Sequence, residues 1–193
     1  SMVSHELRTP LNTLSLQTQL RRRMASGVKL TDAQLQTMAE RDEQQIRNMV
    51  RLIDDMLDVS RLRQGTLAIA PEPADLALLV RRVVESHAEQ SASVGSPITV
   101  EEPEHLHGIW DEFRIEQVVA NLLTNAMRYG GGKPVLVRVE RDGDTASVTV
   151  RDQGIGISQA DQARIFGQFE RAVDAKVTPG LGLGLFISLQ IVQ

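Results

Sequence analysis

Two long helical patterns at the start of the chain limit its fold more than any other feature. Apolar residues recur at three- and four-residue steps from residue 2 to about residue 24, and again from residue 31 to about residue 62. Gly27 lies between these stretches, and Thr31-Asp32-Ala33-Gln34 is a capping box that opens the second. The pattern predicts two antiparallel helices. Because one hairpin cannot cover both apolar stripes, we expect two copies to pair as a homodimeric four-helix bundle.

Three features interrupt these helical patterns. Pro10 lacks an amide donor, so we expect a kink in the first helix rather than its end. Arg21-Arg22-Arg23 lie where the helix macrodipole favours cations, and we interpret them as a solvated basic end. Asp42 occupies an apolar position of the second helix. It is either a buried polar residue that fixes the register or part of an exposed turn, and we favour the exposed turn.

The rest of the chain mixes short strands with helices. The expected strands are residues 66–69, 97–101, 135–140 and 146–151, and the expected helices are a third helix capped by Asp75 and residues 111–129, 159–166 and 184–192. Pro71-Glu72-Pro73 is expected as a turn and residues 91–97 as a loop. Because the order is not strictly βαβ, residues 65–193 are expected to form an α/β sandwich after a helical domain at 1–64, an α+β chain overall.

The composition excludes several classes of site. A net charge of -4 argues against nucleic acid as the main partner, and the absence of cysteine excludes disulfides and thiolate metal sites. No stretch approaches the ~20 apolar residues that span a bilayer. We therefore expect no direct membrane contact here and a cytoplasmic location. His105 and His107 suggest a metal only weakly, because no carboxylate-rich or cysteine cluster follows them, and we expect a surface loop.

Two polar motifs lie on or next to these expected helices and strands. Asn121 and Asn125 are four residues apart on one helix, so their amides share a face. Their oxygens suit a magnesium ion shared with phosphates, although two helix amides can also cap each other. Asp152 ends a strand and opens a segment with Gly154 and Gly156. Its carboxylate can accept the exocyclic amine of adenine where the glycines allow close approach, although Gly-x-Gly is also common in turns.

A third motif precedes the last expected helix. Gly180, Gly182 and Gly184 are each followed by leucine. Unhindered amides at the positive end of a helix form a phosphate site, and the alternative is a flexible linker. The spacing is neither a dinucleotide fingerprint nor a P-loop, since no Gly-Lys-Ser/Thr follows.

His5 gains a chemical role only from these downstream motifs. A histidine near a chain end is by itself most simply a surface residue. With a phosphate donor in the same chain, its unprotonated ring nitrogen is a nucleophile that can attack phosphorus, because the pKa of free imidazole is about 6.5.

Five segments, in this order, resemble the motifs of two-component sensor histidine kinases. They are Ser4 to Leu11 (the H box), Asn121 to Tyr129 (the N box), Asp152 to Ile157 (the first glycine box), Phe166 to Arg171 (the F box) and Gly180 to Leu185 (the second glycine box). The resemblance implies a dimeric helical hairpin followed by a Bergerat-type ATP-binding fold. It also implies a protein-histidine kinase that phosphorylates itself from ATP and then a response regulator.

The resemblance assigns roles to residues of the H box. His5 would accept the phosphoryl group, and Glu6 would take the imidazole proton or orient the ring. Thr9 would align a water molecule that hydrolyses the phosphorylated regulator, which implies phosphatase activity.

The resemblance also implies a set of nucleotide-binding residues. Asn125 would hold Mg2+, Asn121 would support the phosphates, and Asp152 would bind adenine. Arg128, Tyr129 and Arg171 would contact the triphosphate or ribose, and residues 173–182 would form a lid. The full set is Asn121, Asn125, Arg128, Tyr129, Asp152, Gly154, Gly156, Ile157, Phe169, Arg171, Gly180, Leu181, Gly182, Leu183, Gly184 and Leu185.

The chain departs from the family pattern at three points. Leu181 stands where a small polar residue is common, and Arg128 replaces a lysine, which keeps the charge but changes the geometry. The chain also starts close to His5 and ends at Gln193, so we expect a fragment. Two other functions stay open: an ATPase that drives a conformational clamp, and a dimerisation scaffold without catalysis.

Overall fold

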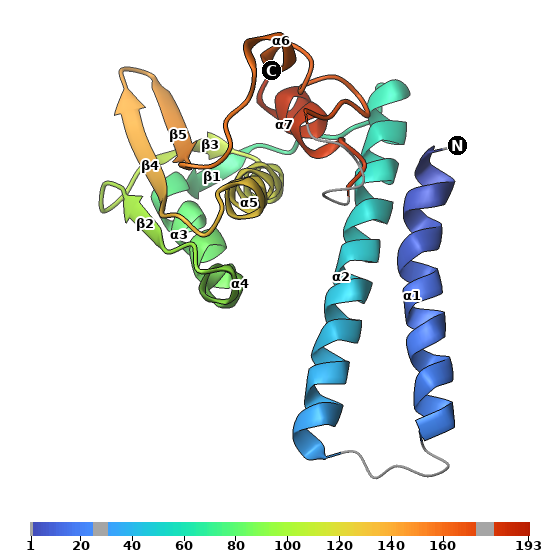
Figure 1. The fold of residues 1–193 in the computed structure, drawn as a ribbon. Helices are drawn as coiled ribbons and strands as arrows, with labels where there is room; N and C mark the ends of the chain where they lie inside the picture. Colours follow the sequence, from blue (N-terminus) through green and yellow to red (C-terminus); the bar gives the residue numbers. More distant parts are fainter. Residues whose placement is uncertain (1, 25–30, 173–179) are drawn as a thin grey trace.

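The hairpin predicted for the start of the chain is present. The computed structural model describes residues 2–24, 31–172 and 180–193. The antiparallel helices α1 (Met2–Met24) and α2 (Asp32–Arg63) lie side by side (Figure 1). Thr31 forms both hydrogen bonds of the capping box with Gln34, and α1 continues through Pro10. The predicted helix end at Gly27 lies outside the described residues. None of the described helices has both the length and the apolar character needed to cross a bilayer.

A polar pair links the two helices where the sequence predicted exposure. Arg21 of α1 forms an ion pair with Asp42 of α2, and its guanidinium also donates to the backbone oxygen of Met38 at 3.3 Å. The two charged side chains are only 33% and 21% exposed. The predictions of a solvated Arg21 and an exposed turn at Asp42 were therefore wrong, because each residue supplies the counter-charge that the other needs when half-buried.

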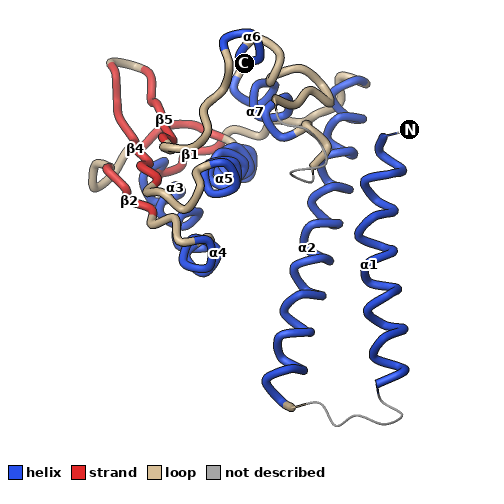
Figure 2. Tube along the Cα trace, viewed as in Figure 1, coloured by secondary structure: helices blue, strands red, loops and turns tan. Residues whose placement is uncertain are grey.

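The second part of the chain is an α+β sandwich, as predicted. Its elements are β1 (Glu72–Asp75), α3 (Leu76–Ser86), α4 (Ala88–Val94), β2 (Ile98–Glu101), β3 (His107–Trp110), α5 (Glu112–Tyr129), β4 (Val135–Asp142), β5 (Thr145–Arg151), α6 (Gln159–Gln162) and α7 (Gly184–Val192). β4 is parallel to β2 and antiparallel to β5, and β1 pairs antiparallel with β3. Figure 2 shows these strands on the side of α5 away from the hairpin.

The core of this part fixes the position of α5. Val135, Val137 and Val139 alternate along β4 and are at most 2% exposed, which is the period expected for one buried face of a strand. They form one apolar cluster with α3 and with Val119 and Leu123 of α5. Burial of each such side chain contributes roughly 1.5–3 kcal/mol. This packing holds one face of α5, and a polar face of the same helix meets α2 and α7.

Several short elements differ from the sequence predictions. Residues 66–69 form no strand. Glu72 and Pro73, expected within a turn over 71–73, instead begin β1, a strand paired on one side only, where proline is tolerated. Residues 91–94, expected in a loop over 91–97, belong to α4, and His107 begins β3. The helix expected over 159–166 ends at Gln162. At β1 and β3, pairing between strands more than 30 residues apart in sequence outweighs the local pattern.

Candidate active site

The second half of α5 carries a buried asparagine with partners from two other helices. Asn121 is 6% exposed. Its Nδ2 donates to Ser188 Oγ of α7 at 3.0 Å, and its Oδ1 accepts from Arg51 Nη2 of α2 at 3.1 Å. Asn125, one turn later, is half-buried. The amide of Asn121 is therefore held by α2 and α7 and not by its neighbour on the same helix.

The Asp152 segment folds back onto the end of α5. Asp152 Oδ1 accepts a hydrogen bond from the Gly154 amide at 2.8 Å, and the Ile155 amide donates to the Tyr129 backbone oxygen at 3.2 Å. A Cβ on Gly154 would lie 2.0 Å from that same Tyr129 oxygen, so only glycine fits there. The exposed Asp152 carboxylate is thus fixed beside the last turn of α5.

Glycines of the second glycine box lie against the N box. A Cβ added to Gly184 would lie 2.1 Å from Asn121 Oδ1, and one added to Gly180 would lie 3.2 Å from Arg128 Nη1. Gly180 and Gly184 therefore bring the backbone that precedes α7 into direct contact with two of the predicted nucleotide-binding residues.

The middle glycine makes the same kind of contact with the F box. A Cβ on Gly182 would lie 2.5 Å from the Glu170 backbone oxygen and 3.0 Å from Arg171 Cγ. Phe169 has a φ of 64°, the only positive φ of a non-glycine residue in the described ranges. This left-handed conformation costs an aromatic residue on the order of 1–3 kcal/mol, which the close contact with Gly182 must offset. The F box and the second glycine box thus form one packed unit.

The N-terminus of α7 presents backbone amides without a capping side chain. No side chain caps this nine-residue helix, so the amides at its positive end are suited to phosphate. Leu181 and Leu183 are 3% and 1% exposed, and their side chains pack with Val59 of α2. Leu185 is half-buried. Any contribution of Leu181 and Leu183 to phosphate binding must therefore come from their backbone.

A buried ion pair joins α2 to α5. Arg114 Nη1 donates to Asp58 Oδ2 at 2.8 Å, with side chains 7% and 6% exposed, and Gln117 Nε2 donates to the same oxygen at 2.7 Å. Sequence reasoning missed all three residues. Asp58 lies between Leu57 and Val59, and a charged residue between two apolar ones was the only signal in the sequence. Nothing in the sequence identified its partner Arg114, which is 56 residues away.

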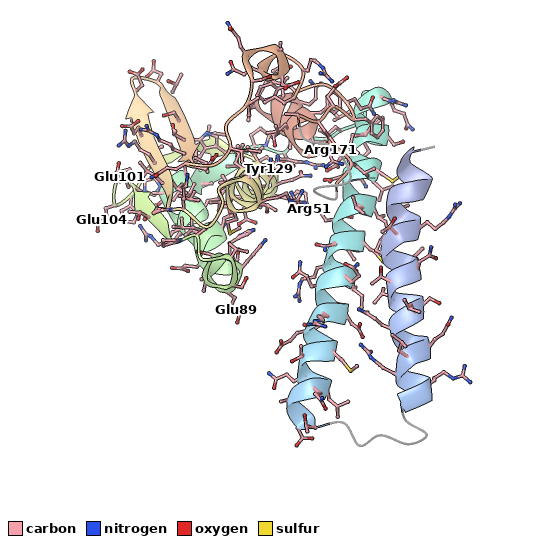
Figure 3. The ribbon with its side chains drawn as sticks, viewed as in Figure 1. Arg51, Glu89, Glu101, Glu104, Tyr129 and Arg171 are labelled. Atoms are coloured by element: carbon pink, nitrogen blue, oxygen red, sulfur yellow. The ribbon has the colours of Figure 1, made fainter. Side chains whose placement is uncertain are left out.

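Burial also changes the acid–base properties of α2. Burial, followed by the neighbouring charge of Asp58, raises the pKa of Asp55 from 3.8 to about 6, although Arg51 opposes this. Burial and the nearby Arg128 lower the pKa of Arg51. Figure 3 shows Arg51 extending from α2 toward α5. The contact between α2 and α5 therefore brings the charged side chains of Arg51, Asp55 and Arg128 close together.

The H box lies on α1, apart from these motifs. His5 and Glu6 belong to α1, but their side chains lie outside the described part of the chain. Thr9 is exposed. In Figure 1, α2 stands between α1 and the helices α5 and α7. The structure thus brings the nucleotide motifs together but does not bring His5 to them. Residues 173–179 of the expected lid also lie outside the described part.

The donors present fit the expected magnesium ion. Asn125 lies on α5, one turn after Asn121 and one turn before Arg128, and it offers a neutral amide oxygen. Mg2+ prefers oxygen donors, keeps several waters and shares phosphate oxygens with its protein ligands, so one asparagine beside a phosphate site is a suitable ligand set.

The chain matches two family models. Residues 110–193 match the histidine kinase-, DNA gyrase B- and HSP90-like ATPases, and residues 1–65 match the His Kinase A (phospho-acceptor) domain. The sensor histidine kinase MtrB of Mycobacterium leprae is 32% identical over 193 residues, which cover 98% of this chain and 34% of that protein. The chain thus spans about a third of the length of that relative.

Solved structures show the same fold. The histidine kinase AdeS of Acinetobacter baumannii has a TM-score of 0.70 at 23% identity, covering 97% of this chain and 85% of that one. Full-length ShkA in complex with AMPPNP has a TM-score of 0.67 at 24% identity, covering 94% of this chain and 40% of that one. These likenesses extend over both the helical hairpin and the sandwich.

Proposed function

The chain belongs to the two-component sensor histidine kinases, and on this basis we propose that it transfers the γ-phosphoryl group of ATP to His5 as a protein-histidine kinase. The observation that carries the proposal is the contact of Gly180, Gly182 and Gly184 with the N box and the F box. These three motifs meet next to the amides of α7, and the first glycine box lies against the last residue of the N box. We divide the chain into a phosphoacceptor part, residues 1–64, and an ATP-binding part, residues 65–193.

The residues of the ATP-binding part orient the nucleotide. Asp152 accepts the exocyclic amine of adenine, and the amides that open α7 bind phosphate oxygens. Arg128 and Arg171 add positive charge near the triphosphate. Asn125 would hold Mg2+, which neutralises phosphate charge when bound. The protein contributes mostly by positioning the reacting groups and by its charges.

The chemical step needs a neutral imidazole. A ring nitrogen of His5 forms a bond to the γ-phosphorus as the bond to the β–γ bridging oxygen breaks, and ADP leaves with that electron pair. Glu6 accepts the imidazole proton or orients the ring. The phosphoryl group then passes from His5 to an aspartate of a response regulator, and Thr9 aligns a water molecule for its later hydrolysis.

Transfer requires an arrangement other than the one described. His5 lies on α1, and α2 separates it from α5 and α7 (Figure 1). Either the ATP-binding part leaves its contact with α2, or the nucleotide site of a second subunit serves His5.

Exposed apolar residues support a homodimer. Among the described side chains of the hairpin, eight large aliphatic ones are 45–57% exposed: Leu11, Leu16, Leu20, Leu35, Ile46, Val50, Ile53 and Leu57. Apolar faces of this length are normally covered, and a second hairpin supplies a matching face. This part of the protein functions in the cytoplasm, where ATP and the response regulator are found.

The fate of the γ-phosphate tests the proposed function. The chain is incubated with Mg2+ and ATP labelled in the γ position, and label on the protein is measured beside free phosphate. We expect label retained on the protein. Free phosphate without labelled protein would indicate an ATPase clamp instead, and no binding of ATP would indicate a scaffold.

A further inference from the structure

Two histidines and an aspartate meet on elements that hold none of the predicted nucleotide-binding residues. Asp75 ends β1, His107 begins β3, and the two are paired in the antiparallel register of these strands. His105 lies two residues before His107, on the same side of the chain. One donor atom from each of the three residues lies within 4.8 Å of the others. Strand pairing therefore assembles a cluster that is scattered over thirty residues of sequence.

The cluster is held in place by several contacts. His105 Nδ1 lies 2.7 Å from Asp75 Oδ2, and the rings of His105 and His107 are stacked with centroids 5.5 Å apart and an interplanar angle of 11°. Asp75 Oδ1 accepts hydrogen bonds from the Leu106 amide at 3.0 Å and the Ala77 amide at 3.1 Å. The carboxylate is therefore fixed by the backbone, and its second oxygen is directed at the histidines.

The charge of Asp75 is stable near neutral pH. The hydrogen bond from the Leu106 amide, followed by that from His105, holds the pKa of Asp75 well below its usual range. Its side chain is only 10% exposed, whereas that of His105 is 61% exposed. An ionised, largely buried carboxylate thus lies behind two imidazole rings that solvent can reach.

We propose that Asp75, His105 and His107 form a binding site for a divalent transition-metal ion of the zinc type. Imidazole nitrogens and a carboxylate oxygen are ligands that Zn2+ takes at about 2.0–2.2 Å, and three protein ligands with one water complete a tetrahedral site. The cation takes the place of the hydrogen atom between His105 Nδ1 and Asp75 Oδ2, and the neutral imidazole then carries its proton on Nε2. The exposed imidazoles close onto the cation by small side-chain rotations.

The surroundings favour a bound cation. The two histidines line a pocket of about 580 Å³ together with Pro103, Leu106, Val139, Glu140 and Arg141. Glu140 adds a second carboxylate to that pocket, and Arg141 opposes it. Solvent access through the pocket gives the ion a path to the two histidines.

Calorimetric titration of the untagged chain with ZnCl2 at pH 7 tests this site. We expect one equivalent to bind, with the affinity reduced at least tenfold in His105→Gln and in His107→Gln. Both histidines are exposed, so both variants fold, which thermal unfolding without metal checks. Asp75→Asn keeps an N-cap acceptor for α3 but removes the charge, and it is expected to weaken binding as well.

The chain offers its own controls in its two other histidines. His5→Gln and His87→Gln are expected to bind Zn2+ like the parent. The proposal is overturned if the parent shows no saturable binding, if His105→Gln and His107→Gln both bind like the parent, or if His5→Gln alone abolishes binding.

Discussion

Asn121 is the residue at which the two parts of the chain meet. It bonds to Arg51 of the hairpin and to Ser188 of α7, and it lies directly against Gly184. The asparagine was predicted from sequence as a nucleotide residue, but its link to the hairpin was not, because Arg51 is an ordinary charged residue in a charged helix. One amide thus connects α7 with helix α2 of the hairpin.

Gly184→Ala tests this close contact. The added methyl group lies 2.1 Å from Asn121 Oδ1, and the asparagine can move only by losing its bonds to Arg51 and Ser188. We expect ATP affinity to fall at least tenfold and stability to fall by about 1–3 kcal/mol, measured by calorimetry and chemical denaturation. Gly143→Ala strains a distant turn with a φ of 59° and should leave ATP affinity unchanged. Equal affinities of parent and Gly184→Ala would contradict the contact.

The raised pKa of Asp55 predicts a pH dependence of stability. Its ordinary pKa is 3.8 and its folded pKa is about 6. Between these values the folded chain binds more protons than the unfolded chain, so Asp55 lowers stability as the pH rises through this window. At pH 7.5, Asp55→Asn should therefore be more stable than the parent by about 3 kcal/mol, and at pH 4 by much less. Denaturation across this range tests the sign, and Asp54→Asn, at an exposed position, is the control.

At the scale of elements, α2 is both half of the hairpin and the surface on which the ATP-binding part rests. Val59 packs against Leu181, Leu183 and Ile187, and Asp58 bonds to Arg114. The contact therefore combines apolar burial with a buried charge pair, whose removal from one side leaves an uncompensated charge.

Asp58→Ala should destabilise the protein by about 3–5 kcal/mol, because Arg114 is left buried without its counter-ion. Chemical denaturation measures this loss. Arg61→Ala is the matched control, since Arg61 is 56% exposed and lies 3.6 Å from the same carboxylate, and it should cost less than about 1 kcal/mol. Similar losses of stability in the two variants would show that the buried pair of Asp58 with Arg114 contributes no more than the exposed contact with Arg61.

The elements predicted correctly were those with local signals. The capping box at Thr31, the N-cap residues Asp75 and Ser158 and the bounds of α7 all follow from neighbouring residues. β1 and the pair of Asp58 with Arg114 depend on partners 30 or more residues away, which a single sequence does not reveal. The same holds for the metal-binding cluster, where the histidines were visible and Asp75 was recognised only as a helix cap.

At the scale of the whole molecule, the exposed apolar face of the hairpin predicts its assembly. Ile46 and Val50 of α2 are 52% and 51% exposed. Introduction of a charge by Ile46→Glu should weaken the dimer at least tenfold, because the charge would be buried in the bundle. Sedimentation equilibrium measures this change. Ile109→Glu, at a 69% exposed position of β3, should leave the dimer intact. A monomeric parent would contradict the four-helix bundle.

The chemical nature and position of the protein-bound phosphoryl group distinguish a protein-histidine kinase from the alternatives. Parent, His5→Gln and Asn125→Ala are incubated with γ-labelled ATP and Mg2+, and the protein-bound label is tested for acid and alkali stability. For phosphoryl transfer to His5, we expect acid-labile, alkali-stable label on the parent, no label on His5→Gln although it binds ATP normally, and little on Asn125→Ala because nucleotide binding is weakened. Undiminished label on His5→Gln, or acid-stable label on the parent, would contradict it.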